Sequence, residues 1–241
     1  MLIYGKNAIS EALKTGLTIN KLWVEKGTHD ASGEAIISLA KNLKIKISYE
    51  KRDYLTAKTK TTKHQGFAAD VTEFEYSSVH EILQKAEQKQ ELPFVLILDS
   101  IADPHNLGAI IRTAESAGVH GIILQKDRAC PVTDTVYKTS AGAISNMLIA
   151  RVVNISVEIE KLKKQGLWVY GLELGGTDFY KQNLKGPIAV VIGSEGDGIR
   201  PLVKKNCDGV LTLPMCGQVN SLNASVASAV AVYEILRQRQ Y

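Results

Sequence analysis

Three segments of the sequence place polar and charged side chains directly after an apolar run. They span residues 99–124, 186–202 and 211–227. Their amide, guanidinium, carboxylate and hydroxyl groups belong to Asn106, Arg112, Glu195, Ser221 and Asn223. Such groups can hold a polar ligand by hydrogen bonds, and a guanidinium can stabilise negative charge on it. Because ligands collect at the carboxyl ends of parallel strands, we expect one composite pocket, built largely of backbone.

The usual signatures of several other chemistries are missing from the sequence. No G-x-G-x-x-G follows the first apolar run of this region, which argues against a Rossmann dinucleotide site and disfavours a generic nucleotide-binding protein. The run GSEGDGI (193–199) lacks the Lys-Ser/Thr of a P-loop, and neither G-x-S-x-G nor HExxH occurs. The five histidines and three cysteines form no ligand cluster, so we expect no metal centre.

The three segments resemble the motifs of the SpoU (TrmH-like) branch of the SPOUT RNA 2′-O-ribose methyltransferases. In order, that family carries N-x-G-x-x-x-R, Gly-x-Glu-Gly after a strand, and Pro-Met-x-Gly with Ser-Leu-Asn-x-Ser. The matching residues are Asn106, Gly108 and Arg112, then Gly193, Glu195 and Gly196, then Pro214, Met215, Gly217 and Ser221–Ser225. Any one motif is weak, whereas three complete motifs in this order are highly specific.

The front of the chain also resembles this family, so that the resemblance spans nearly all of the sequence. YGKNAISEAL and KHQGFAADV are similar to the opening and closing segments of the family's L30e-like substrate-binding domain. The resemblance implies an α/β protein with that N-terminal domain and a C-terminal SPOUT domain, in which a parallel sheet carries a deep trefoil knot. It also implies a homodimer packed through the C-terminal helix, although the sequence alone is equally compatible with a helix inside the core.

The resemblance implies S-adenosylmethionine as the methyl donor, bound by the knot loops mostly through backbone groups. The cofactor-binding positions carried over are Gly193, Leu213, Met215, Gly217 and Leu222. The missing Rossmann signature is then expected, because this family binds its cofactor without it.

The resemblance implies a central catalytic role for Arg112. A guanidinium stays protonated in proteins, so we interpret it as a clamp for a neighbouring phosphate and a stabiliser of the developing alkoxide, not as a base. Asn106 and Asn223 would hold the ribose or Arg112 in register. Glu195 would orient Arg112 or accept a hydrogen bond from the substrate, and Ser221 would shape the pocket. Taken singly, Asn106 also fits a helix cap, Glu195 a helix-start acid and Asn223 a turn residue.

The nearest subgroup by resemblance comprises the bacterial enzymes that methylate a guanosine ribose in 23S ribosomal RNA. Two alternatives stay open within the enzyme class, a transfer-RNA ribose methyltransferase and a resistance-type ribosomal RNA methyltransferase. A third alternative is a non-catalytic RNA-binding ribosome-assembly factor, which the intact motif residues disfavour.

The apolar pattern divides the chain into two α/β parts that would position these residues. In the first, helices are predicted over 7–13 and 31–43, and strands over 21–26, 45–49 and 67–71. In the second, continuous apolar strands separated by helices predict a parallel sheet covered on both faces. Those strands are predicted over 94–98, 121–124, 147–151, 167–172, 188–193 and 210–214. We expect domains over 1–76 and 93–241, joined by a polar linker over 77–92 that contains a helical turn or two.

Positive charge is concentrated in one stretch of the N-terminal part. Residues 41–64 hold eight Lys/Arg and two acidic residues, giving +6, whereas the whole chain carries +4. An isolated run of this kind is usually a solvated face, but beside the motifs it suits binding to an RNA backbone. The RNA-binding residues predicted here are Lys58, Lys60, Lys63, His64 and Gln65.

The composition is that of an ordinary globular protein. With 241 residues, 45% hydrophobic and 22% charged, the chain suits one or two domains that need no disulfide or metal to fold. The three cysteines, Cys130, Cys207 and Cys216, are sparse and odd in number, which fits a reducing compartment. No signal peptide or membrane-length apolar run is visible, so we expect a cytoplasmic protein without membrane contact.

Overall fold

The computed structural model describes residues 2–14, 19–27, 30–71, 74–218 and 221–240. It divides into two compact units, Met1–Glu75 and Tyr76–Tyr241, and each is described by itself. Among the described residues, no helix combines the length and apolar character that a membrane span requires.

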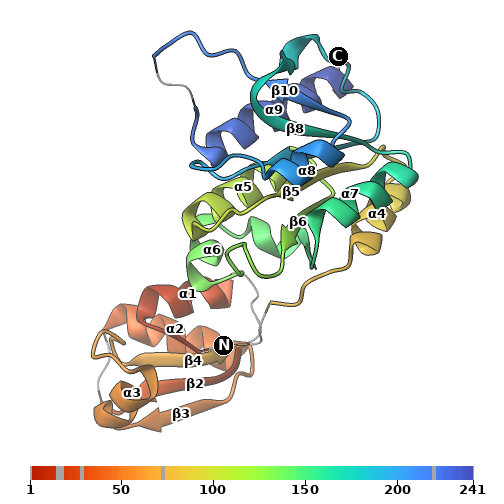
Figure 1. The fold of residues 1–241 in the computed structure, drawn as a ribbon. Helices are drawn as coiled ribbons and strands as arrows, with labels where there is room; N and C mark the ends of the chain where they lie inside the picture. The colour runs from red at the N-terminus through yellow and green to blue at the C-terminus, as the bar shows by residue number, and fades with distance from the viewer. Residues whose placement is uncertain (1, 15–18, 28–29, 72–73, 219–220, 241) are drawn as a thin grey trace. The chain divides into compact units, whose positions relative to one another are not determined.

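The first unit is a four-stranded mixed sheet with helices on both faces (Figure 1). Its strands are β1 (Leu2–Tyr4), β2 (Ile19–Glu25), β3 (Ile47–Glu50) and β4 (Phe67–Val71), in the order β1-β4-β2-β3. Its helices are α1 (Lys6–Lys14), α2 (Ala31–Asn42) and α3 (Arg52–Thr59). Residues Ile9, Leu22, Ile36 and Phe67 belong to the core between the sheet, α1 and α2. On the other face, Leu55 of α3 packs on the sheet.

The predicted helices and strands of this unit are present, and the structure adds β1 and α3. Neither gives a clear sequence signal. β1 has three residues, and α3 has the sequence RDYLTAKT, in which Leu55 is the sole large apolar residue buried. A single buried leucine in eight residues produces no helical periodicity.

The second unit is a six-stranded parallel sheet, as the apolar runs predict. Its strands are β5 (Phe94–Leu98), β6 (Gly121–Gln125), β7 (Leu148–Val152), β8 (Trp168–Asp178), β9 (Ile188–Ile192) and β10 (Gly209–Thr212), in the order β10-β8-β9-β5-β6-β7. Its longer helices are α4 (Val79–Gln88), α5 (Pro104–Ser116), α7 (Ile155–Lys164) and α9 (Ala224–Gln240). The shorter ones are α6 (Asp134–Thr139), η1 (Ala143–Asn146), η2 (Phe179–Lys181) and α8 (Pro201–Asn206).

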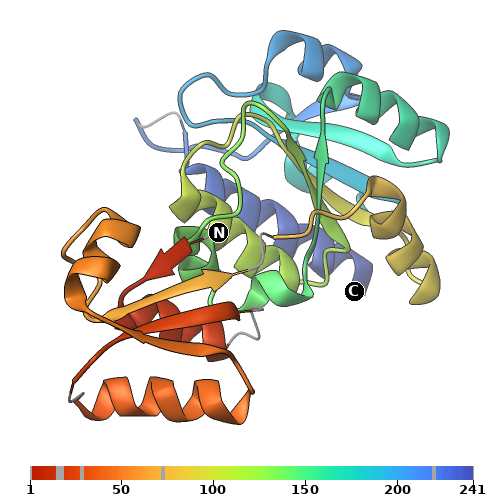
Figure 2. The ribbon, with the colours of Figure 1, turned by 90° about the horizontal axis from the view of Figure 1, so that it is seen from below.

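Helices cover both faces of this sheet (Figure 2). Alternate strand residues such as Val95 and Val191 pack with α4, α7 and α8 on one face. Their neighbours Leu96 and Val190 are fully buried and point to the opposite face, because successive strand side chains alternate. On that face α5 contacts both α6 and α9. Strands buried on both sides explain the uninterrupted apolar runs.

The segment predicted as a linker, 77–92, is an integral part of the second unit. It holds α4, whose Ser78 forms a capping box with Glu81, and Ile82 of this helix is buried in the main core. Gly121 of β6 makes room for it, because an added Cβ would come 2.5 Å from Ile82. The helical turns predicted here are present, but they form one ten-residue helix that packs in the core. The polar side chains of α4 cover its exposed face and mask a narrow apolar stripe.

Candidate active site

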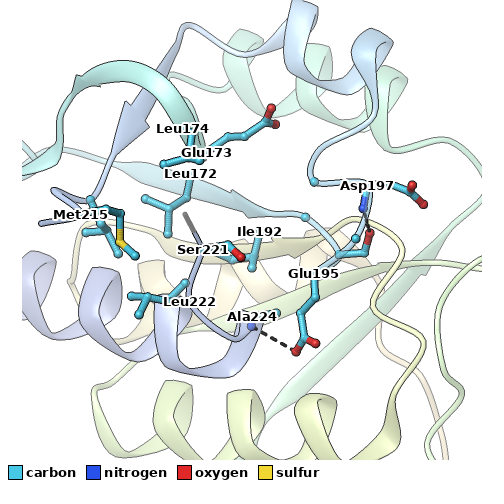
Figure 3. A pocket seen from close by; sticks show the side chains of 16 residues that line it. Leu172, Glu173, Leu174, Ile192, Glu195, Asp197, Met215, Ser221, Leu222 and Ala224 are labelled. Atoms are coloured by element: carbon cyan, nitrogen blue, oxygen red, sulfur yellow. Dashed lines mark hydrogen bonds between the residues drawn. The ribbon is translucent and has the colours of Figure 1, made fainter. Parts of the chain in front are cut away.

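A cavity of about 400 Å³ lies at the carboxyl ends of β9 and β10, beside the middle of β8 and at the start of α9 (Figure 3). Four segments line it, with residues Leu172, Glu173, Leu174, Ile192, Gly193, Ser194, Glu195, Gly196, Asp197, Gly198, Leu213, Met215, Ser221, Leu222, Ala224 and Ala227. The second and third polar segments of the sequence therefore meet at one place. The volume is in the range of small-molecule sites.

The walls of the cavity combine apolar side chains with acids. Figure 3 shows Met215, Leu172 and Leu222 gathered on one side and Glu195 on another. The charged side chains among the described lining residues are all acidic, and they are Glu173, Glu195 and Asp197. Such a site favours a ligand with an apolar body and a positively charged group.

Glu195 is held at the edge of the cavity by two asparagines from distant segments. Its Oε1 atom accepts a hydrogen bond of 2.7 Å from Nδ2 of Asn106 on α5, and another from Nδ2 of Asn223. The Asn223 amide also donates to Oδ1 of Asn106 at 2.9 Å, and the backbone N–H of Ala224 donates to Glu195 at 3.4 Å. The three motifs are thus joined through one carboxylate.

The hydrogen bonds of Asn106, Glu195 and Asn223 show whether each residue only caps a helix or turn, or also takes part in one shared site. Asp103, not Asn106, caps α5, so the amide of Asn106 is free to contact Glu195. Asn223 caps α9 through Oδ1, which accepts from the Ser225 N–H at 2.9 Å, while its Nδ2 belongs to the network. Glu195 does lie at the amino end of a helix. That helix is α9, which begins almost thirty residues later in the chain, and not a helix that Glu195 itself starts.

A buried ion pair ties the loop after β9 to the end of β5. Asp99 is fully buried. It accepts hydrogen bonds from Nε and the backbone N–H of Arg200, at 2.7 and 2.9 Å. Arg200 also donates to Gln125 at the end of β6. The loop that forms one wall of the cavity is therefore anchored at its far end.

Close packing against neighbouring segments explains two of the motif glycines. A Cβ on Gly193 would come 2.2 Å from the carbonyl carbon of Gly198, where the loop turns back and Ser194 pairs with Gly198. A Cβ on Gly108 would come 1.8 Å from Oγ1 of Thr139 on α6. Gly193 thus shapes the cavity wall, and Gly108 permits the close approach of α5 and α6.

Arg112 lies apart from the cavity of its own chain. It is exposed and is not a lining residue. It follows Asn106 by six residues on α5, which places it about 9 Å further along the helix and about 120° around it. Its guanidinium makes no hydrogen bond or ion pair within the described part of the chain. The structure brings together Asn106, Glu195 and Asn223 but leaves Arg112 facing solvent.

The five cofactor positions taken from the motifs differ in their placement. Gly193, Leu213, Met215 and Leu222 line the cavity together with Ser221. Gly217 is exposed and does not line it.

The predicted RNA-binding residues of the first unit differ in how far their side chains are exposed to solvent. Lys60 and Lys63 are exposed, and so is Gln65, whose Oε1 accepts from the Lys6 N–H at 3.0 Å. Lys58 is partly exposed, with its ammonium 3.9 Å from the ring centre of Trp23.

The prediction for His64 was wrong, because this ring is fully buried. Its Nδ1 accepts from the Gly66 N–H at 3.0 Å, and its Nε2 lies 3.1 Å from Oγ1 of Thr56. Burial lowers the pKa of His64. Both nitrogens serve to shape the loop before β4, so His64 is a structural residue. A charged-run argument cannot separate a buried histidine from its exposed neighbours.

Sequence reasoning missed Glu173, Asp99 and Arg200. Glu173 lines the cavity and binds the Ile199 N–H at 3.1 Å and the Lys204 ammonium at 2.8 Å. An aspartate that directly follows the first buried strand, as Asp99 does, was the available signal, because a buried carboxylate needs a partner. No group of three or more His, Cys, Asp or Glu side chains in the described ranges could hold a metal ion.

Two family models match the chain. The model described as SpoU rRNA Methylase family matches residues 93–233. The model described as RNA 2′-O ribose methyltransferase substrate binding matches residues 2–77.

Relatives match over nearly the whole length. YacO of Bacillus subtilis, whose name assigns it to the TrmH family of tRNA/rRNA methyltransferases, is 44% identical over 98% of this chain and 95% of its own. A Staphylococcus haemolyticus protein assigned to the same family is 41% identical over 99% and 96%. Among solved structures, the SpoU methyltransferase AviRb from Streptomyces viridochromogenes, in complex with AdoMet, aligns with a TM-score of 0.75 at 22% identity, covering 100% of this chain and 90% of that one.

Proposed function

The chain belongs to the SpoU rRNA methylase family and is an RNA methyltransferase, and on that premise we propose its donor, its acceptor and its site. The donor is S-adenosylmethionine, and the acceptor is the ribose 2′-hydroxyl of a guanosine in 23S ribosomal RNA. The observation that carries the proposal is the cavity at the strand ends, with Glu195 held beside it by Asn106 and Asn223. The choice of guanosine comes from the resemblance of the motifs to the bacterial 23S subgroup.

The cavity fits S-adenosylmethionine by its chemistry. Leu172, Leu213 and Leu222 offer apolar surface to an adenosine. The acidic groups around the cavity suit the positive sulfur and the ammonium of this molecule. Residues that would hold it are Gly193, Leu213, Met215, Ser221 and Leu222. When bound, S-adenosylmethionine supplies a methyl group already activated by the positive charge on sulfur.

The residues of the chain must then position the ribose hydroxyl and stabilise the oxygen as its proton leaves. Glu195 has one oxygen that accepts from Asn106 and Asn223, which leaves its other oxygen to accept a hydrogen bond from the substrate. Arg112, a permanent cation, clamps a phosphate beside the reacting ribose and stabilises the alkoxide. The clamped phosphate or a water molecule takes the proton.

Because Arg112 is exposed and lies outside its own cavity, we place it at the cavity of a second copy. The helix α9 has apolar side chains available for such a contact, since Val226 is 48% and Tyr233 is 50% exposed. The homodimer is thus part of the proposal, and each site would take its cavity from one chain and Arg112 from the other. A cytoplasmic location, where ribosomal RNA is made, is proposed with it.

Mixing two inactive variants tests this arrangement. Arg112→Ala removes the clamp, and Gly196→Trp is expected to block the cavity, because Gly196 lines it and no atom lies within 4 Å of an added Cβ. If Arg112 acts across the dimer, mixed dimers contain one complete site, and a random mixture recovers about a quarter of the wild-type rate. If it acts within its own chain, the mixture stays inactive.

The acceptor is tested by mapping ribose methylation in total RNA from a strain that lacks the gene. The proposal predicts the loss of one 2′-O-methylguanosine from 23S ribosomal RNA and its return on complementation. Loss of a methyl group from transfer RNA instead would select the alternative acceptor, and an unchanged map in both RNAs would contradict the proposed activity.

A further inference from the structure

A second cavity of about 390 Å³ lies in the first unit, at the end of the sheet where β2 and β4 meet the loops. Its lining comes from five separate stretches of chain, with residues Lys6, Glu25, Lys26, Asp30, Arg52, Gln65 and Gly66. We propose that this cavity binds the phosphodiester backbone of the RNA substrate through Lys6, Lys26 and Arg52. The inference rests on the proposed function, since it names the surface through which the substrate-binding unit holds RNA.

The cations around this cavity converge from separate elements. Lys6 starts α1, Lys26 follows β2 and Arg52 starts α3. Gln65 links them to the loop before β4, because its Oε1 accepts from the backbone of Lys6 while its amide group retains two donors. Lys60 and Lys63, both exposed, belong to the same loop. Residues 52–65, which hold the later part of the basic stretch, and Lys6 near the start of the chain thereby form one surface, which leaves out Lys41 and Lys44.

Lys6, Lys26 and Arg52 are available to bind an anion, because one of them is unpaired and the other two form only weak ion pairs. The ammonium of Lys26 makes no hydrogen bond or ion pair with any residue that the structure describes. Lys6 lies 2.7 Å from Asp30, and Arg52 lies 3.3 Å from Glu25. Both pairs are solvent-exposed, and such pairs are worth about 0–1 kcal/mol. Exchanging a carboxylate for a phosphate therefore costs little.

The chemistry of the lining favours backbone over base recognition. Three cations face two carboxylates, and none of the described lining residues is aromatic, so the cavity offers no platform on which a base could stack. A guanidinium and two ammonium groups are suited to phosphate oxygens. Binding of this kind is independent of sequence and depends steeply on salt.

The test measures the affinity of the full-length protein for a labelled, mixed-sequence single-stranded RNA of about 20 nucleotides over a range of salt concentrations. The test variant is Lys26→Gln with Arg52→Gln. The matched control is Lys41→Gln with Lys44→Gln, which removes the same charge at the far end of α2. For single strands the logarithm of affinity changes by about 0.7 per phosphate contact for each tenfold change in salt. Two lost contacts should therefore weaken binding about 25-fold at 0.1 M salt and reduce the slope by about 1.4.

The control variant should retain the wild-type slope. An unchanged slope in the test variant, or an equal loss in both variants, would overturn the proposal. Lys26→Gln alone breaks no described side-chain contact, so its smaller effect, about 5-fold, is measured on a protein whose folding is not disturbed.

The acidic residues separate phosphate binding from base recognition. Asp30→Asn with Glu25→Gln removes two negative charges while an Asn retains the cap on α2. This variant should bind the RNA more tightly if phosphates enter the cavity. Weaker binding would mean that the carboxylates accept hydrogen bonds from a base, and would overturn the proposal.

The binding of S-adenosylmethionine, measured by calorimetry, should be unchanged in all these variants, because the second cavity belongs to the other unit. A wild-type protein that binds RNA but transfers no methyl group would contradict the proposed function and leave the affinity test of this cavity intact.

Discussion

The ion pair between the fully buried Asp99 and the partly exposed Arg200 supports a prediction about the cavity. Replacing Asp99 by Asn keeps the shape and one acceptor but leaves the guanidinium without its counter-charge. Removing one partner of a buried pair costs about 3–5 kcal/mol. The Arg200 side chain is 29% exposed and also contacts Gln125. Water and the Gln125 amide therefore offset part of the free-energy cost of the lost ion pair. We expect the free energy of unfolding to fall by about 2–3 kcal/mol.

The same change should weaken binding of S-adenosylmethionine, because Arg200 ends the loop that lines the cavity. Fixing the backbone of one residue costs about 1 kcal/mol or more. If one or two loop residues must be ordered again on binding, affinity drops about 5- to 30-fold.

The assays are urea denaturation and calorimetry with S-adenosylmethionine. Asp178→Asn is the control, since its acid is exposed, lies 3.7 Å from Lys181 and caps η2 through an oxygen that Asn retains. The control should lose less than about 1 kcal/mol and bind the donor normally. A stability for Asp99→Asn within about 0.5 kcal/mol of wild type would refute the reasoning.

Three further predictions concern catalysis, thiol reactivity and pH. Arg112→Lys keeps the charge but loses the fork, so methyl transfer should slow about 10²–10³-fold with unchanged donor affinity, and a near-normal rate would exclude the clamp. Burial raises the pKa of Cys207 to about 12, so at pH 8 an alkylating reagent should modify the exposed Cys216 first, as peptide mass spectrometry can check. Burial lowers the pKa of His64, so the unfolded state takes up its proton first as pH falls below about 6.5. Urea denaturation should show stability declining there, by at most about 1.4 kcal/mol per pH unit for this group, and His64→Asn should reduce the slope.

Much of the fold can be predicted from the sequence, because elements that are buried on all sides leave a clear apolar pattern. Strands covered on both faces, such as β5 and β9, are uninterrupted apolar runs of five residues, and these runs predict the parallel sheet. By contrast, α3 and α4 each expose most of their surface, and their narrow apolar stripes are hidden among Lys, Gln and Glu. The trefoil knot stays a prediction from the family resemblance.

The candidate site was predictable in its residues but not in its contacts. Periodicity places Glu195 just after a strand and Asn223 just before a helix, yet it cannot show that both meet the amide of Asn106, which is 89 residues from Glu195 along the chain. Burial of a polar side chain is equally invisible to a local pattern, as His64 shows. Contacts of this kind depend on how distant elements pack, and the sequence expresses that only through the combined motifs.

The central claim is that the cavity beside Glu195 delivers a methyl group to a ribose oxygen. The direct measurement incubates the purified protein with isotopically labelled S-adenosylmethionine and 23S ribosomal RNA from the deletion strain, then identifies the labelled nucleoside by mass spectrometry. Label is expected on 2′-O-methylguanosine with the wild-type protein and on no nucleoside with Gly196→Trp. Label on a base, or no transfer to this RNA, would contradict it.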